Sequence, residues 1–213
     1  MSFLDHIARC NNADLRQFEP WFIGRERAGF IHREFAPVLA TRPELFGRTK
    51  QGWHLAASLD QPTKRSAAVR AFLQELHAQG HFKGLWREEA YDVTWEFARP
   101  ALMTMERAAV PWFGVRAYGP HMTGYVRKKD GLHIWVPRRS RDKPTFPGEL
   151  DNTVAGGQPA GIGGLDMTRA LLKEDEADMR GPERHGAIDR FLGLQSADFD
   201  IECHLAQVAR KPD

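Results

Sequence analysis

Residues 151–161 read DNTVAGGQPAG and form a glycine-rich stretch. Glycine pairs let a backbone turn tightly, and a helix rich in acidic residues is expected after this loop, over residues 167–179. A β-hairpin is expected before it, because two strand-like runs, residues 122–126 and 132–136, are joined by the polar turn RKKDG at 127–131. The C-terminal half is therefore expected to run from a hairpin through a glycine loop into an acidic helix.

From residue 138 to residue 161 the sequence resembles the Nudix hydrolases. The resemblance rests on a basic stretch that ends in Pro-Gly-x-Leu-Asp and is followed by VAGGQPAG before a helix. More narrowly, the sequence is similar to the branch associated with thiamine pyrophosphokinase, in which a helical and stranded N-terminal domain of unassigned function precedes the catalytic domain. ERAAVP at 106–111 and GPHMTGYV at 119–126 also resemble that branch, and the resemblance covers most of residues 1–180.

The resemblance implies a loop–helix–loop whose helix presents carboxylates to Mg²⁺ or Mn²⁺, hard cations that prefer oxygen ligands. Such a metal bridges to diphosphate oxygens and lowers the pKa of the attacking water. The implied activity is hydrolysis of small molecules that contain a diphosphate, namely nucleoside diphosphate derivatives or thiamine diphosphate analogues. The metal candidates are Glu174, Asp175, Glu176 and Asp178, of which Glu174 and Glu176 are also the catalytic candidates.

The acidic helix departs from the family's spacing, which puts acids at i, i+3 and i+4 on one helical face. If Glu174 stands for the first acid of the pattern, the paired acids fall at Ala177 and Asp178. If Asp175 and Glu176 stand for the pair, the first acid falls at Leu172. Each register loses a carboxylate. The alternative function is therefore a catalytically inactive binding or regulatory protein with a Nudix fold, and an isolated acidic run is typical of a solvated helix face.

Arginines before the glycine loop are the phosphate candidates, because guanidinium groups match phosphate oxygens with two parallel hydrogen bonds. An ordinary basic loop explains these arginines equally well. Asp151 and Asn152 are expected to turn the chain through hydrogen bonds from side chain to backbone. The expected substrate-binding residues are Arg138, Arg139, Arg141, Gly156 and Gly157.

We predict an α+β protein with an N-terminal mixed α/β domain over residues 1–118 and an incomplete Nudix-like α/β/α sandwich over residues 119–213. In the first domain the clearest helix covers residues 63–79, where buried-type residues recur at i, i+3, i+4 and i+7 and Gly80 supplies the stop. Few residues follow Met179, so the second domain looks shortened. Weaker patterns predict helices at 2–10 and 35–40 and a hairpin within 21–31. They also predict strands at 53–57, 91–97, 101–113 (interrupted at Pro111), 188–194 and 199–205.

Composition places this chain among folded proteins. Of its 213 residues 42% are hydrophobic and 27% are charged, and the net charge of +2 favours neither nucleic-acid nor membrane partners. Asp5 and His6 come too early for a signal peptide, and no apolar run reaches the roughly 20 residues that cross a bilayer. Cys10 and Cys203 fit free thiols, with one long-range disulfide left open. We expect a cytoplasmic protein, and a homodimer that completes the sandwich is a further alternative.

Overall fold

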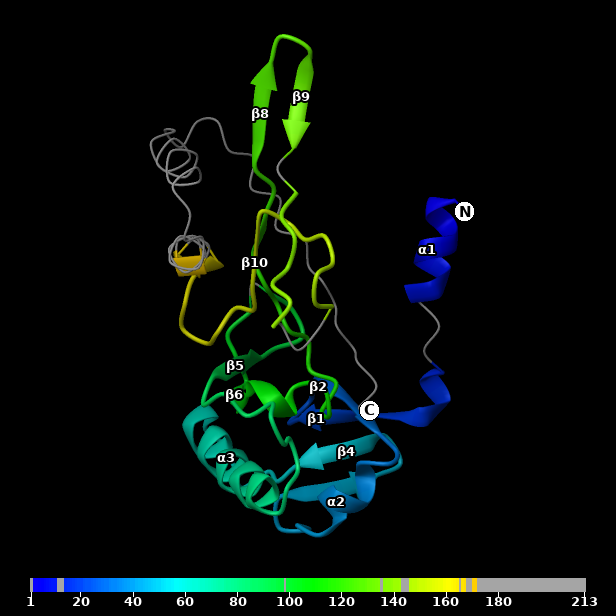
Figure 1. The fold of residues 1–213 in the computed structure, drawn as a ribbon. Helices are drawn as coiled ribbons and strands as arrows, with labels where there is room; N and C mark the ends of the chain where they lie inside the picture. The colour runs from blue at the N-terminus through cyan, green and yellow to red at the C-terminus, as the bar shows by residue number, and fades with distance from the viewer. Residues whose placement is uncertain are drawn as a thin grey trace. The chain divides into compact units, whose positions relative to one another are not determined.

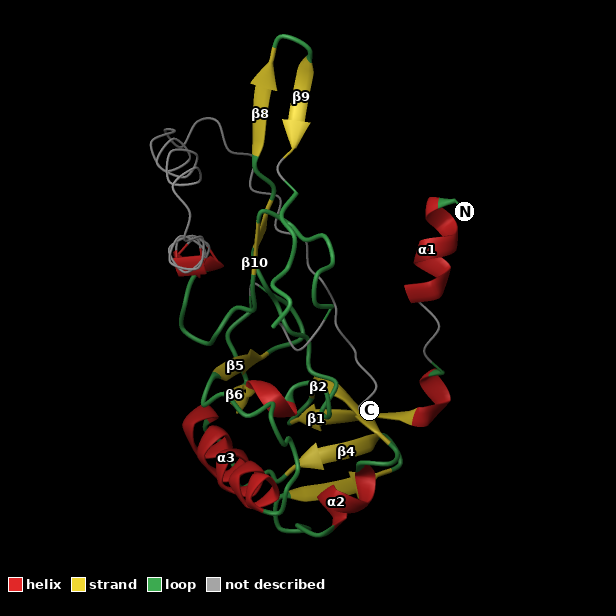
Figure 2. Cartoon of the chain, viewed as in Figure 1, coloured by secondary structure: helices red, strands yellow, loops and turns green. Residues whose placement is uncertain are grey.

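The computed structural model describes residues 2–10, 14–97, 99–134, 136–142, 146–164, 166–167 and 170–171. Helices and strands are mixed along the chain, so the protein is α+β as predicted (Figure 1 and Figure 2). Two compact units are present, the first running to Arg116 and the second beginning at Ala117. We describe each unit by itself.

The first unit contains a four-stranded sheet in the order β2-β1-β4-β3. β1 (Phe18–Ile23) and β2 (Glu26–His32) form the predicted hairpin, which turns through Gly24 with a φ of 61°. β4 (Gly52–Leu55) runs parallel to β1 and antiparallel to β3 (Phe46–Thr49). The hairpin was visible in the sequence, whereas the parallel pairing of β1 with β4 was not.

The predicted helix over residues 63–79 is confirmed as α3 (Pro62–Ala78). Its apolar stripe of Val69, Phe72, Leu73 and Leu76 is buried, and the chain leaves the helix at Gly80, where φ is 95°. Two shorter helices are α1 (Phe3–Cys10) and α2 (Ala36–Ala40), with a 3₁₀ turn at Leu15–Gln17. Ser2 begins α1, because its hydroxyl accepts a hydrogen bond from the Asp5 N–H while the Asp5 carboxylate accepts one from the Ser2 N–H.

A small antiparallel pair, β5 (Ala90–Val93) and β6 (Met103–Glu106), lies beside α3. Of the strand predicted over residues 101–113 with an interruption at Pro111, only Met103–Glu106 forms a strand, because β6 ends at Glu106. The Glu106 carboxylate accepts a hydrogen bond from the Ala108 N–H and so caps a 3₁₀ turn over Arg107–Ala109. A side chain that satisfies the backbone locally competes with continued strand pairing.

Aromatic side chains fill the core of the first unit around Phe113, which is fully buried. The Phe113 ring lies 5.4 Å from those of Trp21 and Phe35 and 6.0 Å from that of Phe46, measured between centroids. Its carbonyl accepts a hydrogen bond of 2.8 Å from the Trp21 indole. A Cβ at Gly29 would lie 2.3 Å from the same carbonyl, so β2 approaches this segment closely only because position 29 is glycine.

The described residues of the second unit form two separate strand pairs. β7 (His121–Met122) pairs antiparallel with β10 (Val154–Ala155), and β8 (Tyr125–Lys128) pairs antiparallel with β9 (Gly131–Ile134). The expected hairpin is confirmed as β8–β9, but the expected continuous first strand over 122–126 is wrong. It is divided at Gly124, whose N–H donates to the Thr153 hydroxyl at 2.7 Å instead of to a neighbouring strand.

Candidate functional site

The first half of the glycine loop is an extended segment that pairs with residues 118–122. Beyond β10, the Gly156 N–H donates to the Pro120 carbonyl at 3.3 Å, and the Gln158 N–H donates to the Tyr118 carbonyl at 2.9 Å. A Cβ at Gly119 would lie 2.2 Å from the Gly156 carbonyl oxygen, so the two backbones approach this closely because position 119 is glycine. The loop is thus held in place along one side.

Gly156 also makes room for the helix that follows the loop. Residues 164, 166, 167, 170 and 171 are helical, and a Cβ at Gly156 would lie 2.6 Å from a methyl carbon of Leu171. The helix begins before Met167, earlier than the sequence predicted. Gly156 therefore has a close-packing role, while substrate binding by Gly156 and Gly157 stays a prediction.

Two of the three candidate arginines contact the segment that precedes the glycine loop. Arg138 donates from Nη1 to the Gly148 carbonyl at 2.6 Å. The Arg139 guanidinium forms an ion pair with Asp151, and both side chains are about three-quarters buried. Arg141 is exposed. The basic loop is thereby fixed to the start of the glycine loop, and Arg139 already has an anionic partner.

Asp151 makes a local hydrogen bond from side chain to backbone, as the sequence suggested, whereas the Asn152 side chain contacts a distant residue instead. One Asp151 carboxylate oxygen accepts from the Asn152 N–H at 2.9 Å, while the other oxygen faces Arg139. The Asn152 side-chain amide lies 2.7 Å from Nδ1 of His121 on β7. These contacts join the basic loop, β7 and the glycine loop into one polar network.

The expected metal ligands lie outside the described residues: Glu174, Asp175, Glu176 and Asp178. Within the part of the chain that the structure describes, no group of three or more His, Cys, Asp and Glu side chains is placed to hold a metal ion. The metal site therefore stays a prediction from the sequence.

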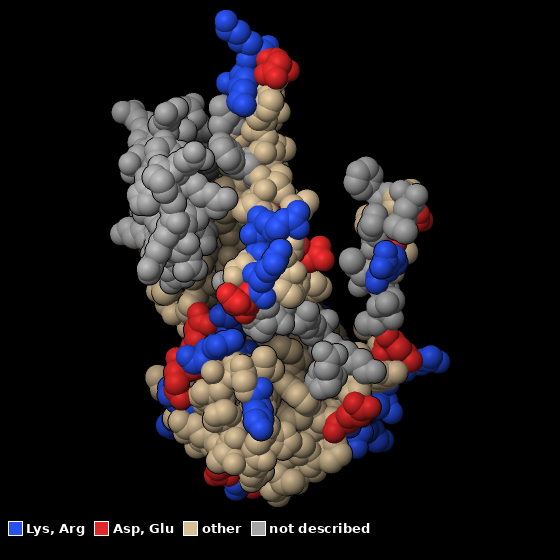
Figure 3. Space-filling view, in the orientation of Figure 1, with Lys and Arg blue, Asp and Glu red and all other residues tan. Residues whose placement is uncertain are grey.

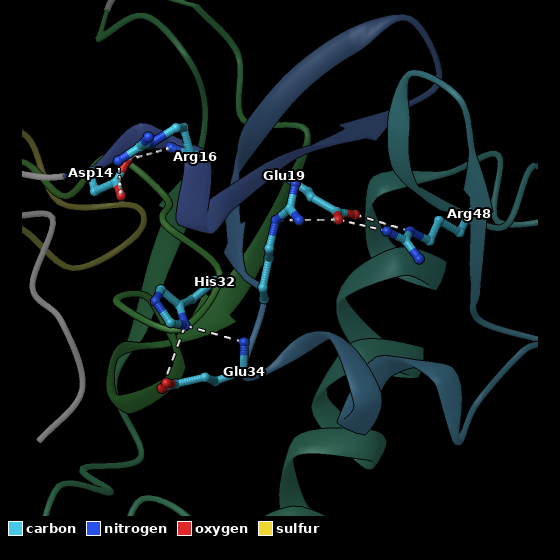
Figure 4. Close-up of polar contacts among 7 residues, drawn as sticks. Asp14, Arg16, Glu19, His32, Glu34 and Arg48 are labelled. Atoms are coloured by element: carbon cyan, nitrogen blue, oxygen red, sulfur yellow. Dashed lines mark hydrogen bonds and ion pairs between the residues drawn. The ribbon is translucent and has the colours of Figure 1, made fainter.

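A second polar cluster lies on the sheet of the first unit (Figure 4). Glu19 accepts two hydrogen bonds from Arg48, at 2.6 and 3.0 Å, and lies 3.8 Å from Arg33. His32 is buried and accepts a hydrogen bond at Nδ1 from the Glu34 N–H, so a neutral ring carries its proton on Nε2, which lies 3.2 Å from the Gln17 amide oxygen. Both ring nitrogens and both Glu19 oxygens have partners, which is typical of structural contacts.

Sequence reasoning missed one arrangement in the first unit. Trp21 and Trp53 are buried. Trp95 is half-buried and holds the guanidinium groups of Arg27 and Arg116, each 3.7 Å from its ring centroid. No regular spacing links residues 27, 95 and 116. No local pattern could have revealed this contact.

Residues 2–117 match the family described as a domain of unknown function, DUF4743. The match covers more than half of the chain, and the chain belongs to this family. Among the described helices, none combines the length and the apolar character needed to cross a membrane.

Sequence similarity to curated proteins extends beyond this domain. The chain is 36% identical over 180 residues to a protein of Arabidopsis thaliana named Nudix hydrolase 24, chloroplastic, a match that covers 83% of this chain and 48% of that protein. It is also 36% identical over 171 residues to Nudix hydrolase 20, chloroplastic, of the same plant, covering 75% of this chain and 46% of that protein. An uncharacterized protein of Saccharomyces cerevisiae is 36% identical over 104 residues, covering 46% of this chain and 30% of that protein. The chain spans about half the length of the two plant relatives.

Proposed function

We propose that this chain takes part in divalent-metal-dependent hydrolysis of small molecules that contain a diphosphate. The similarity to Nudix hydrolase 24 carries the proposal. Since less than a fifth of this chain lies outside that match, residues 151–161 lie inside it wherever the match begins. Nucleoside diphosphate derivatives and thiamine diphosphate analogues are the proposed substrates, because the motifs around the glycine loop resemble the branch associated with thiamine pyrophosphokinase.

The second unit is proposed to be the front part of a Nudix-like α/β/α sandwich, with a boundary near residue 118. Mg²⁺ or Mn²⁺ would be held by Glu174, Asp175, Glu176 and Asp178, whose carboxylates are the oxygen ligands that these cations prefer. When bound, the metal would activate water and neutralise diphosphate charge. Arg138 and Arg141 would contact the diphosphate, and Arg139 would join them by exchanging Asp151 for a phosphate oxygen.

The acidic spacing favours a second candidate, a catalytically inactive binding or regulatory protein of the same fold. Either register of the helix puts Leu172 or Ala177 where the family pattern has an acid. Water can replace one ligand of Mg²⁺, but a missing carboxylate weakens metal binding and leaves the attacking water less well positioned.

Phosphate release from a panel of diphosphate substrates, with Mg²⁺ or Mn²⁺, separates the two candidates. The test variant combines Glu174→Gln, Asp175→Asn and Glu176→Gln. The control combines Glu34→Gln, Glu44→Gln and Asp60→Asn, which removes the same charge from exposed acids of the first unit.

The enzyme proposal expects metal-dependent turnover that the control retains and the test variant loses. Absence of metal-dependent turnover in the unaltered protein would overturn it in favour of the inactive fold. Equal turnover in the test variant and the control would keep the activity and refute the proposed ligands.

We further propose that the protein is cytoplasmic and forms a homodimer. Its proposed binding partner is a small diphosphate, and neither nucleic acid nor a membrane is a proposed partner. In the dimer a second copy would complete the sandwich of the second unit. Sedimentation velocity at several protein concentrations tests whether the dimer forms, and a strict monomer at every concentration would contradict it.

A further inference from the structure

The inference concerns the first unit, the domain of unknown function, and does not depend on the proposed hydrolase activity. Arg27 on β2 and Arg116 each place a guanidinium carbon 3.7 Å from the centroid of Trp95. One face of an indole has room for one planar guanidinium at that contact distance. The two cations therefore lie on opposite faces of the ring, separated by no more than twice that distance.

Neither cation has a counter-charge in the part of the chain that the structure describes. No carboxylate of that part lies within ion-pair distance of Arg27 or of Arg116, and the Arg27 side chain makes no hydrogen bond to it. Arg116 donates from Nη1 to the Trp95 carbonyl at 2.6 Å, while its Nε is buried with no partner. Two like charges this close are within the Debye length of about 8 Å at physiological salt, so water and salt do not screen their repulsion fully.

A purely structural role does not need this arrangement. One arginine on one tryptophan face is a common stabilising contact, and a second cation on the other face adds repulsion that no neighbouring carboxylate relieves. Elsewhere in the same unit, Arg48 and Arg107 lie over aromatic rings and each also has a carboxylate partner, Glu19 and Glu89 respectively. Among the described residues, neither Arg27 nor Arg116 has a carboxylate partner.

We propose that Arg27 and Arg116, held on the two faces of Trp95, form a binding site for a phosphate-type dianion, such as inorganic phosphate, diphosphate or the phosphate group of a small molecule. Two fixed cations match two negative charges, and guanidinium N–H groups match phosphate oxygens. Because stacking already restricts both side chains, little conformational freedom is lost when the anion binds. Both faces of Trp95 are occupied, so the site recognises charge and does not stack a base.

The test is a titration of the full chain with inorganic phosphate and with pyrophosphate, followed by calorimetry and tryptophan fluorescence. EDTA is present throughout, so that binding through a metal in the second unit does not contribute. The variants are Arg27→Gln and Arg116→Gln. The matched control is Arg70→Gln, which removes the same charge from an exposed ion pair in the first unit. Arg141→Gln, from the basic loop, is a comparison variant that shows whether the anion binds at that loop instead.

The proposal expects saturable binding of at least one of the two anions, and this binding should weaken as salt is added. Each test variant should lose roughly tenfold or more in affinity, because it lacks a charged hydrogen-bond donor. The Arg70→Gln control should bind as the unaltered protein does. If a Gln variant does not fold, Arg27→Lys and Arg116→Lys replace it, and they should bind more weakly because lysine keeps the charge without the planar fork.

No saturable binding to the unaltered protein would overturn the site. Unchanged affinity in the Arg27 and Arg116 variants would also overturn it, as would a loss confined to Arg141→Gln, which would place the anion at the basic loop. Because metal is absent, these outcomes are independent of whether the chain hydrolyses a diphosphate.

Discussion

The two units differ in where their large apolar side chains lie. In the first unit, residues such as Trp21 and Phe113 are enclosed by other aromatic rings. In the described residues of the second unit, the buried apolar side chains are Pro120, Met122 and Val154, while others remain more than half exposed: Leu132, Ile134, Val136, Phe146 and Leu150. The β8–β9 hairpin carries Lys and Arg at its tip (Figure 3).

The contrast shows that a segment can form regular strand pairs without burying an apolar core. A two-stranded hairpin alone is marginally stable in water. The described part of the first unit contains its own core. The described part of the second unit has strand pairs and a loop network but little buried apolar surface.

The largest expected effect tests the core of the first unit. Phe113→Ala should lower the free energy of unfolding by about 3–5 kcal/mol, because it leaves a cavity among three aromatic rings. The matched control, Phe146→Ala, removes the same side chain from an exposed position of the second unit and should change it by less than about 0.5 kcal/mol. Urea denaturation followed by tryptophan fluorescence measures both, and equal losses would remove the contrast between the units.

A smaller effect is expected where the second unit is closely packed. Gly119→Ala places a Cβ against the Gly156 carbonyl and should weaken the pairing by about 1–3 kcal/mol. Hydrogen exchange of the Gly156 and Gln158 amides should accelerate, while that of the Val69 amide in α3 should not. Gly163→Ala, with its nearest atom at 3.7 Å, is the control. Unchanged exchange at Gly156 and Gln158 would contradict the observed pairing.

A pH-dependent effect is expected at Tyr91 in the first unit. Burial raises the pKa of its phenol, with Arg107 opposing and Glu89 adding to the shift. As the pH rises above about 10, the unfolded chain ionises this tyrosine more readily than the folded chain does, so stability falls. Tyr91→Phe should reduce the loss of melting temperature between pH 8 and pH 10.5. An identical loss in both proteins would show that Tyr91 does not contribute.

The smallest effect is expected on the exposed face of the hairpin. Ile134→Ser should change the melting temperature little, because the side chain is 57% exposed. Differential scanning calorimetry measures it, with Ile31→Ser from the core of the first unit as the contrasting variant. A large loss in Ile134→Ser would mean that something covers this face, and sedimentation of both proteins would then show whether a second copy does.

The candidate site could be predicted from the sequence only in part. The glycine loop and the local hydrogen bond of the Asp151 side chain were recognisable because their residues are neighbours in the chain. The pairing of Gly119 with Gly156 was not, because no short-range pattern specifies which distant backbone will approach a glycine. The acidic residues from 174 to 178 were chosen from the sequence alone and lie outside the described residues.

The sequence by itself determined the local elements. Apolar residues at helical spacing with a terminal glycine are sufficient to define α3, and a turn between two apolar runs defines the β1–β2 hairpin. Tertiary structure alone decided that β1 runs parallel to β4, that residues 121–128 are divided between two partners, and that Arg27 and Arg116 meet on Trp95. Local periodicity depends only on residues that are near one another in the sequence, whereas contacts between distant residues form only when the chain folds and buries its core.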